Sequence, residues 1–101
     1  MAKITKADII DTIYEKSEME RKDIHSMLDF FLEEIKNALV SDKIIELRGF
    51  GTFEVKKRKG RIKARNPKTG ESLTVDPHGV VFFRAGRDLK NDVYKLKPGN
   101  E

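Results

Sequence analysis

The 101-residue chain has 21 Lys and Arg against 17 Asp and Glu, a formal net charge of +4, and no cysteine. Without cysteine, disulfides and thiolate zinc sites are excluded, and His25 and His78 are too far apart to form a ligand-spaced pair, so neither a metal nor a cofactor is predicted. No stretch approaches the ~18 apolar residues of a membrane span, and the first residues lack the apolar run of a secretory signal, which predicts a cytoplasmic protein. A single domain of this length has a small hydrophobic core, which by itself stabilises the fold only weakly. Because disulfides and a structural metal are excluded, we expect a partner subunit to provide the additional stability.

A first helix is predicted near the N-terminus. Thr5 is a good N-cap, and Asp8 stands three residues later, where it completes a capping box. Ile4 and Ile9 flank the cap with the spacing of a hydrophobic staple. The helix is predicted to run to about Lys16, because apolar residues recur at helical spacing at Ile9, Ile10, Ile13 and Tyr14.

A second, longer helix is predicted from about Glu20 to about Val40. Its apolar stripe is wider than one packing contact requires, and Phe30 and Phe31 are adjacent. Either this helix is covered within one subunit or it packs against a second subunit, and the shortness of the chain favours the second. We therefore predict a homodimer, with a dimer core formed by Phe30, Phe31, Ile35, Leu47, Phe50, Phe53 and Phe82.

Beyond Ser41 the hydrophobic period changes to two, which predicts strands. A short strand over 43–48 leads into a tight turn at Gly49–Gly51, whose glycines permit a positive φ or a close approach of another chain segment. A second strand starts at Thr52–Val55 and continues into a basic segment.

The chain is predicted to turn at residues 66–70, where Pro67 sets φ and Gly70 supplies a left-handed residue. A strand returns over Glu71–Val75, with Leu73 and Val75 matching Phe53 and Val55 near the base of the hairpin. An irregular bend at 76–79 precedes a buried-type strand over 80–83.

The resulting fold class is α+β. Two N-terminal helices precede a three-stranded antiparallel sheet, from which a long β-hairpin arm over about residues 53–76 protrudes. A short helix to about Lys95 completes a single domain of residues 1–96, and 97–101 form a frayed C-terminal tail.

The positive excess of the chain lies in one segment, since eight of the thirteen residues from Lys56 to Lys68 are Lys or Arg. The other 88 residues hold 13 basic and 17 acidic side chains. A charge block this local indicates an anionic partner, and nucleic acid fits best. A solvated run or a targeting tag is the common alternative. Here the run ends in a defined turn and returns as an apolar strand, which predicts an ordered hairpin.

Alternation along an unbroken strand would align five cations on one face, about 6.6 Å apart. They are Lys57, Lys59, Arg61, Lys63 and Arg65. Gly60 is a candidate for a bulge that shifts this register. Pro67 at the tip has two interpretations. It serves only to form the turn, or it is a rigid wedge that unstacks base steps and kinks a duplex, as minor-groove benders such as IHF and HU do.

Three segments closely resemble the bacterial HU/IHF histone-like DNA-binding proteins: Gly49–Phe53, Arg65–Gly70 and Phe83–Lys90. The resemblance extends from Ile4 to about Leu96. It implies an intertwined dimer whose helices form a body and whose two β-arms wrap double-stranded DNA through the minor groove in the nucleoid. It also implies that the arm-tip prolines stand at two kinks in the DNA.

Carried onto this chain, the resemblance assigns three sets of DNA-contacting residues. The arm contacts are Lys56, Lys57, Arg58, Lys59, Arg61, Lys63, Arg65, Asn66 and Lys68, with Thr69 and Gly70 forming the tip turn. The wedge is Pro67. The flanking phosphate contacts are Lys3, Thr5, Lys6, Arg84, Arg87 and Lys90.

The sequence favours one of three function classes. An architectural protein that bends DNA with little sequence preference is favoured, because minor-groove contacts mainly distinguish A·T from G·C and no recognition helix is apparent. IHF-like site-specific bending is an alternative, as is a structural RNA- or ribosome-binding protein that uses the same basic hairpin. An enzyme is not predicted, because no phosphate loop, zinc motif or nucleophile elbow is present.

Overall fold

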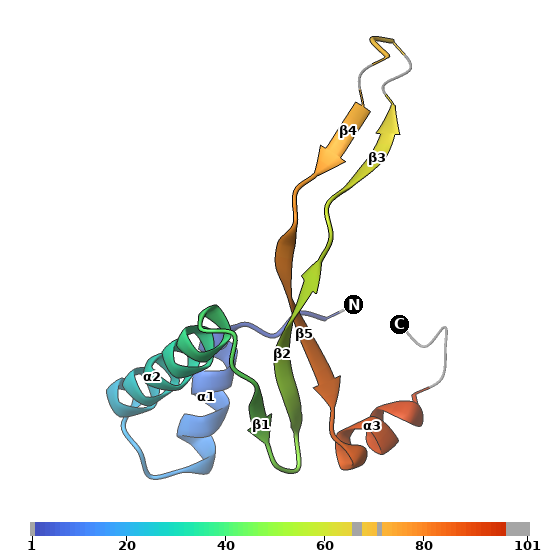
Figure 1. Ribbon diagram of the computed structural model, residues 1–101. Coiled ribbons are helices and arrows are strands. Elements are labelled where there is room, and N and C mark those ends of the chain that lie inside the picture. Colours follow the sequence, from blue (N-terminus) through green and yellow to red (C-terminus); the bar gives the residue numbers. More distant parts are fainter. Residues whose placement is uncertain (1, 66–67, 71, 97–101) are drawn as a thin grey trace.

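The computed structural model describes residues 2–65, 68–70 and 72–96. The predicted C-terminal tail, residues 97–101, lies outside these residues. In chain order the elements are α1 (Lys6–Lys16), α2 (Arg21–Val40), β1 (Ile45–Leu47), β2 (Gly51–Arg58), β3 (Arg61–Arg65), β4 (Ser72–Val75), β5 (His78–Ala85) and α3 (Arg87–Tyr94). The radius of gyration is 19.4 Å, against about 13 Å for a compact domain of this length. Figure 1 shows the reason: a narrow arm of β3 and β4 extends far beyond the body.

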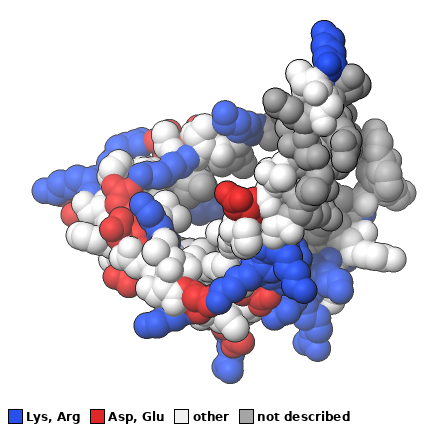
Figure 2. Space-filling view, turned by 45° about the horizontal axis from the view of Figure 1, so that its top comes forward, with Lys and Arg blue, Asp and Glu red and all other residues white. Residues whose placement is uncertain are grey.

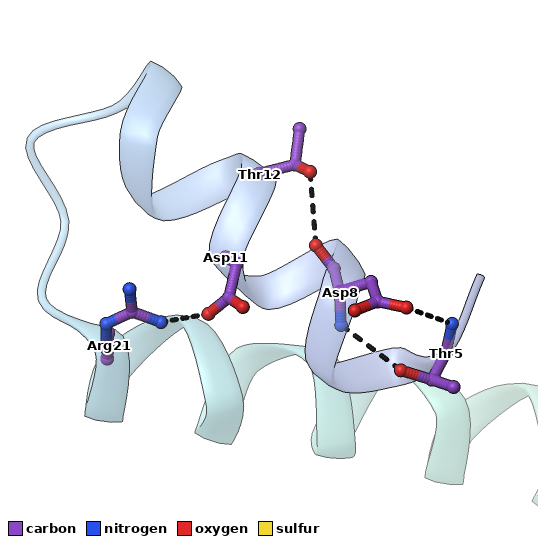
Figure 3. A network of polar contacts seen from close by, with 5 residues as sticks. All are labelled: Thr5, Asp8, Asp11, Thr12 and Arg21. Carbon is purple, nitrogen blue, oxygen red and sulfur yellow. Dashed lines mark hydrogen bonds and ion pairs between the residues drawn. The ribbon is translucent and has the colours of Figure 1, made fainter.

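The capping box predicted for α1 is present. The Asp8 amide donates to the Thr5 hydroxyl at 3.3 Å, and the Asp8 carboxylate accepts from the Thr5 amide at 2.9 Å. These hydrogen bonds stabilise the charged carboxylate, so the pKa of Asp8 lies below its usual value. Arg21 at the start of α2 forms an ion pair with Asp11 of α1 (Figure 3), which joins the two helices across their connection.

Three strands form the body sheet in the order β1-β2-β5, and all neighbours are antiparallel. The turn between β1 and β2 depends on its two glycines, as predicted. Gly49 has a φ of +86°, and a Cβ on Gly51 would lie 2.6 Å from the Phe83 ring and the Arg84 carbonyl oxygen. The Gly-Phe-Gly sequence therefore closes this hairpin and allows β5 to approach it.

The basic segment is not one unbroken strand, and its irregularity falls at Gly60, the residue that the sequence marked as a candidate for a bulge. The outgoing strand is interrupted at Lys59–Gly60 and the returning strand at Asp76–Pro77, so β3 and β4 form a separate two-stranded sheet. A Cβ on Gly60 would lie 2.4 Å from the Val75 carbonyl oxygen and 2.9 Å from Pro77 Cδ. The chains approach closely here, and proline has no N–H to continue the ladder.

A second irregularity follows within the arm. The register shifts between Ile62 and Ala64, which pair with Thr74 and Leu73 respectively. Two residue steps on β3 thus match one step on β4. The strict alternation assumed for residues 57–65 does not continue along the arm, because a bulge changes which residue stands opposite which.

Two predicted strand boundaries and one predicted cross-strand match also need correction. The first strand is shorter than 43–48, because the Lys43 amide donates to the Ala38 carbonyl at 2.9 Å in the turn that ends α2. The last strand begins at His78, so the irregular segment is Asp76–Pro77 alone. Leu73 pairs with Ala64 on the arm and does not match Phe53, whose partner is Phe83.

A single chain buries little apolar surface. Among the described residues only Ile10 and Ile24 are buried hydrophobics, whereas Phe30 is 70% exposed and Phe31 is 46% exposed. This wide exposed stripe on α2 is what an intertwined dimer requires, since a monomer of this kind would leave its largest apolar side chains in water. The predicted α+β fold, with two N-terminal helices, an antiparallel sheet, an arm and a short last helix, is confirmed.

Candidate nucleic-acid interface

The basic residues at the base of the arm have three different environments. The Lys56 ammonium lies 3.8 Å from the centroid of the Phe82 ring. The Lys57 ammonium forms an ion pair with Asp42 at 2.9 Å. Arg58 and Lys59 are exposed, and neither forms an ion pair with any residue that the structure describes. Figure 2 shows positive side chains gathered where the arm leaves the body, and another at its far end.

The arm carries the remaining basic residues outward. Arg61, Lys63 and Arg65 belong to β3, which places their backbone along the arm and beyond the kink at Gly60. Asn66 and Pro67, predicted as a tip contact and as the wedge, lie outside the described residues. Lys68 and Thr69 form an exposed turn, and Gly70 has the predicted left-handed φ, at +77°.

Two of the phosphate contacts predicted near the N-terminus, Thr5 and Lys6, already interact with other residues of the same chain. The Thr5 hydroxyl accepts from the Asp8 amide, and Lys6 forms an ion pair with Asp29 of α2. His25 Nδ1 lies 3.1 Å from the same Asp29 carboxylate. The hydrogen bond from Lys6, followed by the charge of His25, holds the pKa of Asp29 below its usual value. Lys3 is exposed.

The flanking residues near α3 are exposed. Arg84 at the end of β5 is 65% exposed, and its guanidinium lies 3.7 Å from the Glu54 carboxylate. Arg87 is the first residue of α3, and Lys90 lies one turn later. The N-cap is Gly86, which has no side chain to accept from the first amides of the helix. The N-terminus of α3 thus presents amide donors, and the exposed cations Arg84 and Arg87 stand close to it in the sequence, a combination that suits an anion.

Sequence reasoning missed the carboxylates that hold these cations. Asp29, Asp42 and Glu54 each form an ion pair with a residue predicted to contact DNA. Asp42 lies in the turn after α2 with a φ of +59°, a left-handed conformation that Asp tolerates better than most residues. Only Glu54 had a signal in the sequence, because it is the acidic residue on the strand that runs into the basic segment.

Phe30 and Phe31 lie on α2, whereas the other aromatic residues predicted for the dimer core lie in the body sheet and its β1–β2 turn and do not share one face. The Phe83 ring lies 4.7 Å from Phe53 and 5.2 Å from Phe50, measured between centroids. Phe82 pairs across the strands with Glu54, which places it on the opposite face. The adjacent phenylalanines of β5 therefore have different surroundings.

Within the described ranges, no group of three or more His, Cys, Asp or Glu residues is placed to hold a metal ion. No described helix has the length and apolar character needed to cross a membrane.

The sequence is similar to those of known bacterial proteins. Residues 4–94 match a family model described as bacterial DNA-binding protein. The integration host factor subunit alpha of Buchnera aphidicola subsp. Acyrthosiphon pisum (strain Tuc7) is 38% identical over 99 residues, which cover 96% of each chain. The same subunit of Aliivibrio fischeri (strain MJ11) is 40% identical over 93 residues, which cover 92% of this chain and 94% of that one.

Solved structures agree with the fold. An Anabaena HU–DNA cocrystal structure has a TM-score of 0.82 and 33% identity, and the match covers 92% of this chain and all of that one. A mutant HU from Thermotoga maritima has a TM-score of 0.65 and 29% identity, with 89% and 99% coverage. The likeness therefore includes the arm as well as the body.

Proposed function

Because the chain belongs to the HU/IHF family of bacterial DNA-binding proteins, we propose that it acts as a homodimer that wraps and bends double-stranded DNA with little sequence preference. The family consists of architectural DNA-binding proteins and not of enzymes, in line with the absence of catalytic motifs from the sequence. Its proposed location is the nucleoid in the cytoplasm, where such a protein compacts DNA.

The observation that carries this proposal is the placement of the basic segment on a projecting two-stranded arm. Cations at the base, Arg58 and Lys59, lead into Arg61 on β3, and Lys68 stands at the far turn. A ribbon of this kind fits along a DNA groove, with lysines and arginines against the phosphates. The similar Anabaena HU structure is a cocrystal with DNA, which supports DNA as the ligand of this chain.

Bending is proposed to depend on Pro67. Pro67 lies in the sequence between β3 and β4 and outside the described residues, so its position at the tip of the arm is part of the proposal. A rigid apolar side chain inserted between base steps unstacks them, and the resulting kink lets the duplex follow the arms toward the body. The electrostatic contacts supply affinity, and the wedge determines the shape of the bound DNA.

Dimerisation is proposed from the apolar surface that one chain leaves open. An apolar groove between α1 and α2 adds to the exposed phenylalanines, and it is lined by Ile13, Met19, Ile24, Met27, Leu28 and Phe31. A second copy of the chain is the simplest partner. The predicted mass in sedimentation equilibrium is twice the 11.6 kDa of one chain, and a monomer would contradict the proposal.

Site-specific bending is the second candidate function, and the relatives named integration host factor subunit alpha, at 38% and 40% identity, favour it. In that case the chain is one subunit of a heterodimer and the deformability of particular sequences provides the specificity. RNA binding has no support from these relatives, and we do not propose it.

A FRET bending assay on end-labelled duplexes tests the proposal. Mixed-sequence, nicked and candidate-site duplexes are compared at one salt concentration, with double-stranded RNA as a competitor. A general bender binds the intact duplexes with similar affinity and prefers the nicked one, because bending a nicked duplex costs less energy. A preference of about 10³-fold or more for one sequence would instead support the site-specific function. Stronger binding to RNA would contradict both.

A further inference from the structure

The body sheet has one apolar face and one mixed face. Phe53 and Phe83 are cross-strand partners on the first face, together with Val55 and Val81. On the second face the cross-strand pairs are Thr52 with Arg84, Glu54 with Phe82, and Lys56 with Val80. Alternation of this kind places the first face toward a protein core and the second toward the outside. Phe82 is the one large aromatic residue among the charged groups of this outer face.

Phe82 holds a lysine in a defined position. The Lys56 ammonium lies 3.8 Å from the centroid of its ring, and Phe82 remains 37% exposed. The two residues are diagonal neighbours across β2 and β5, a separation that a long side chain can span. The face of an aromatic ring attracts a cation. The contact therefore restricts a lysine side chain that would otherwise sample many rotamers.

The neighbouring charges leave Lys56 available. The Glu54 carboxylate, whose side chain is 19% exposed, has its own partner in the Arg84 guanidinium at 3.7 Å. No residue in the described ranges forms an ion pair with Lys56, whereas the next residue along β2, Lys57, is paired with Asp42. Lys56 thus stands as an unpaired cation at the base of the arm, on the same strand that continues into Arg58.

We propose that Phe82 is a positioning residue that holds the Lys56 ammonium for contact with a DNA phosphate at the base of the arm. This inference rests on the proposed function, since it specifies one contact of the same interface. Phosphate is the partner that fits, because the group presented is a compact positive charge and most protein–DNA hydrogen bonds are made to phosphate and sugar. The aromatic ring lowers the entropy lost when the lysine binds, and that gain appears as affinity.

The test combines free-protein NMR with DNA binding by fluorescence anisotropy. In the wild-type dimer the Lys56 Hε protons should be shifted upfield by the ring current of Phe82. Phe82→Leu should abolish that shift and weaken duplex binding by about two- to fivefold. Phe82→Tyr keeps an aromatic face and should restore both the shift and the affinity, which a role in apolar packing alone does not predict.

A double-mutant cycle separates positioning from other effects. Lys56→Gln removes the cation, so adding Phe82→Leu to Lys56→Gln should cause no further loss of affinity. An equal loss in both backgrounds would overturn the proposal, as would a Phe82→Leu variant that loses the upfield shift and binds like wild type. The thermal midpoint of each variant is measured alongside, so that a loss of folding is recognised. Failure of wild-type protein to bind duplex DNA would instead refute the proposed function, whatever the NMR result.

Discussion

Removing the carboxylate of Asp42 should strengthen DNA binding. Asp42 forms an ion pair with Lys57 at 2.9 Å, with side-chain exposures of 54% and 77%. In Asp42→Asn this cation is released, while Asn still tolerates the left-handed φ of +59°. An exposed pair of this kind is worth about 0.5 kcal/mol. Two pairs per dimer therefore correspond to about fivefold tighter binding.

The salt dependence of binding provides a sharper measurement than affinity alone. Eight basic residues lie between Lys56 and Lys68 in each chain, and if about half of those in a dimer meet phosphates the log–log slope is roughly −7. Two released lysines should make this slope steeper by about 1.8, since each phosphate neutralised adds about 0.9. The assay is anisotropy titration of a labelled duplex at four or more salt concentrations.

A matched control removes the same charge elsewhere. Asp92 lies on α3, where its carboxylate is 3.9 Å from Lys95, so Asp92→Asn changes the net charge without freeing an arm cation. It should leave the slope unchanged and raise affinity only slightly. If Asp42→Asn and Asp92→Asn behaved alike, the ion pair would not restrain Lys57. A wild-type slope near −2 would mean that the arms are not the main contact.

Three further changes test other parts of the structure. Pro67→Ala should keep most of the electrostatic affinity and reduce the FRET change on an end-labelled duplex; bending equal to wild type would remove the wedge role. Gly51→Ala should destabilise the dimer by about 1–3 kcal/mol in urea unfolding, because the new Cβ lies 2.6 Å from the Phe83 ring; a change under about 0.5 kcal/mol would show that β5 can move aside. Asp8 and Asp29 have pKa values below the usual 3.8, so their stabilising contribution is present above that pH and is lost as pH falls through the lowered values. Asp29→Asn should reduce this acid sensitivity in thermal melts, and an unchanged pH profile would contradict the assignment.

Local sequence was sufficient for the helices and turns. The Thr5 and Asp8 capping box lies within four residues, so its hydrogen bonds could be predicted from spacing alone. The second helix ends at Val40 as predicted, and the glycine conformations at Gly49 and Gly70 follow from turn chemistry. The position of the basic segment is equally a property of the sequence, since it needs only a count of charges along the chain.

Contacts across strands could not be predicted in the same way. The kink of the arm arises where Gly60 meets Val75 and Pro77, and the register shift at Ile62 and Ala64 changes the alternation beyond it. Both depend on how two strands pair, and a pairing register is a relation between segments distant along the chain. The choice between a single row of five cations and a register shifted at Gly60 could therefore not be made from the sequence.

The sequence by itself determined that this chain has a basic segment in a hairpin, and that its helices carry more apolar surface than one subunit covers. It placed the start of the arm at about residue 53, whereas the strand from Gly51 to Arg58 belongs to the body sheet and the arm begins with β3 at Arg61. Only the tertiary structure decided which of the cations are free. Lys57 and Arg84 are paired with carboxylates, and Lys56 is held over Phe82 on the outer face of the sheet. The physical reason is that charge and hydrophobic period are properties of the residues along the chain, whereas ion pairs and ring contacts depend on distances of a few ångströms between elements that folding brings together.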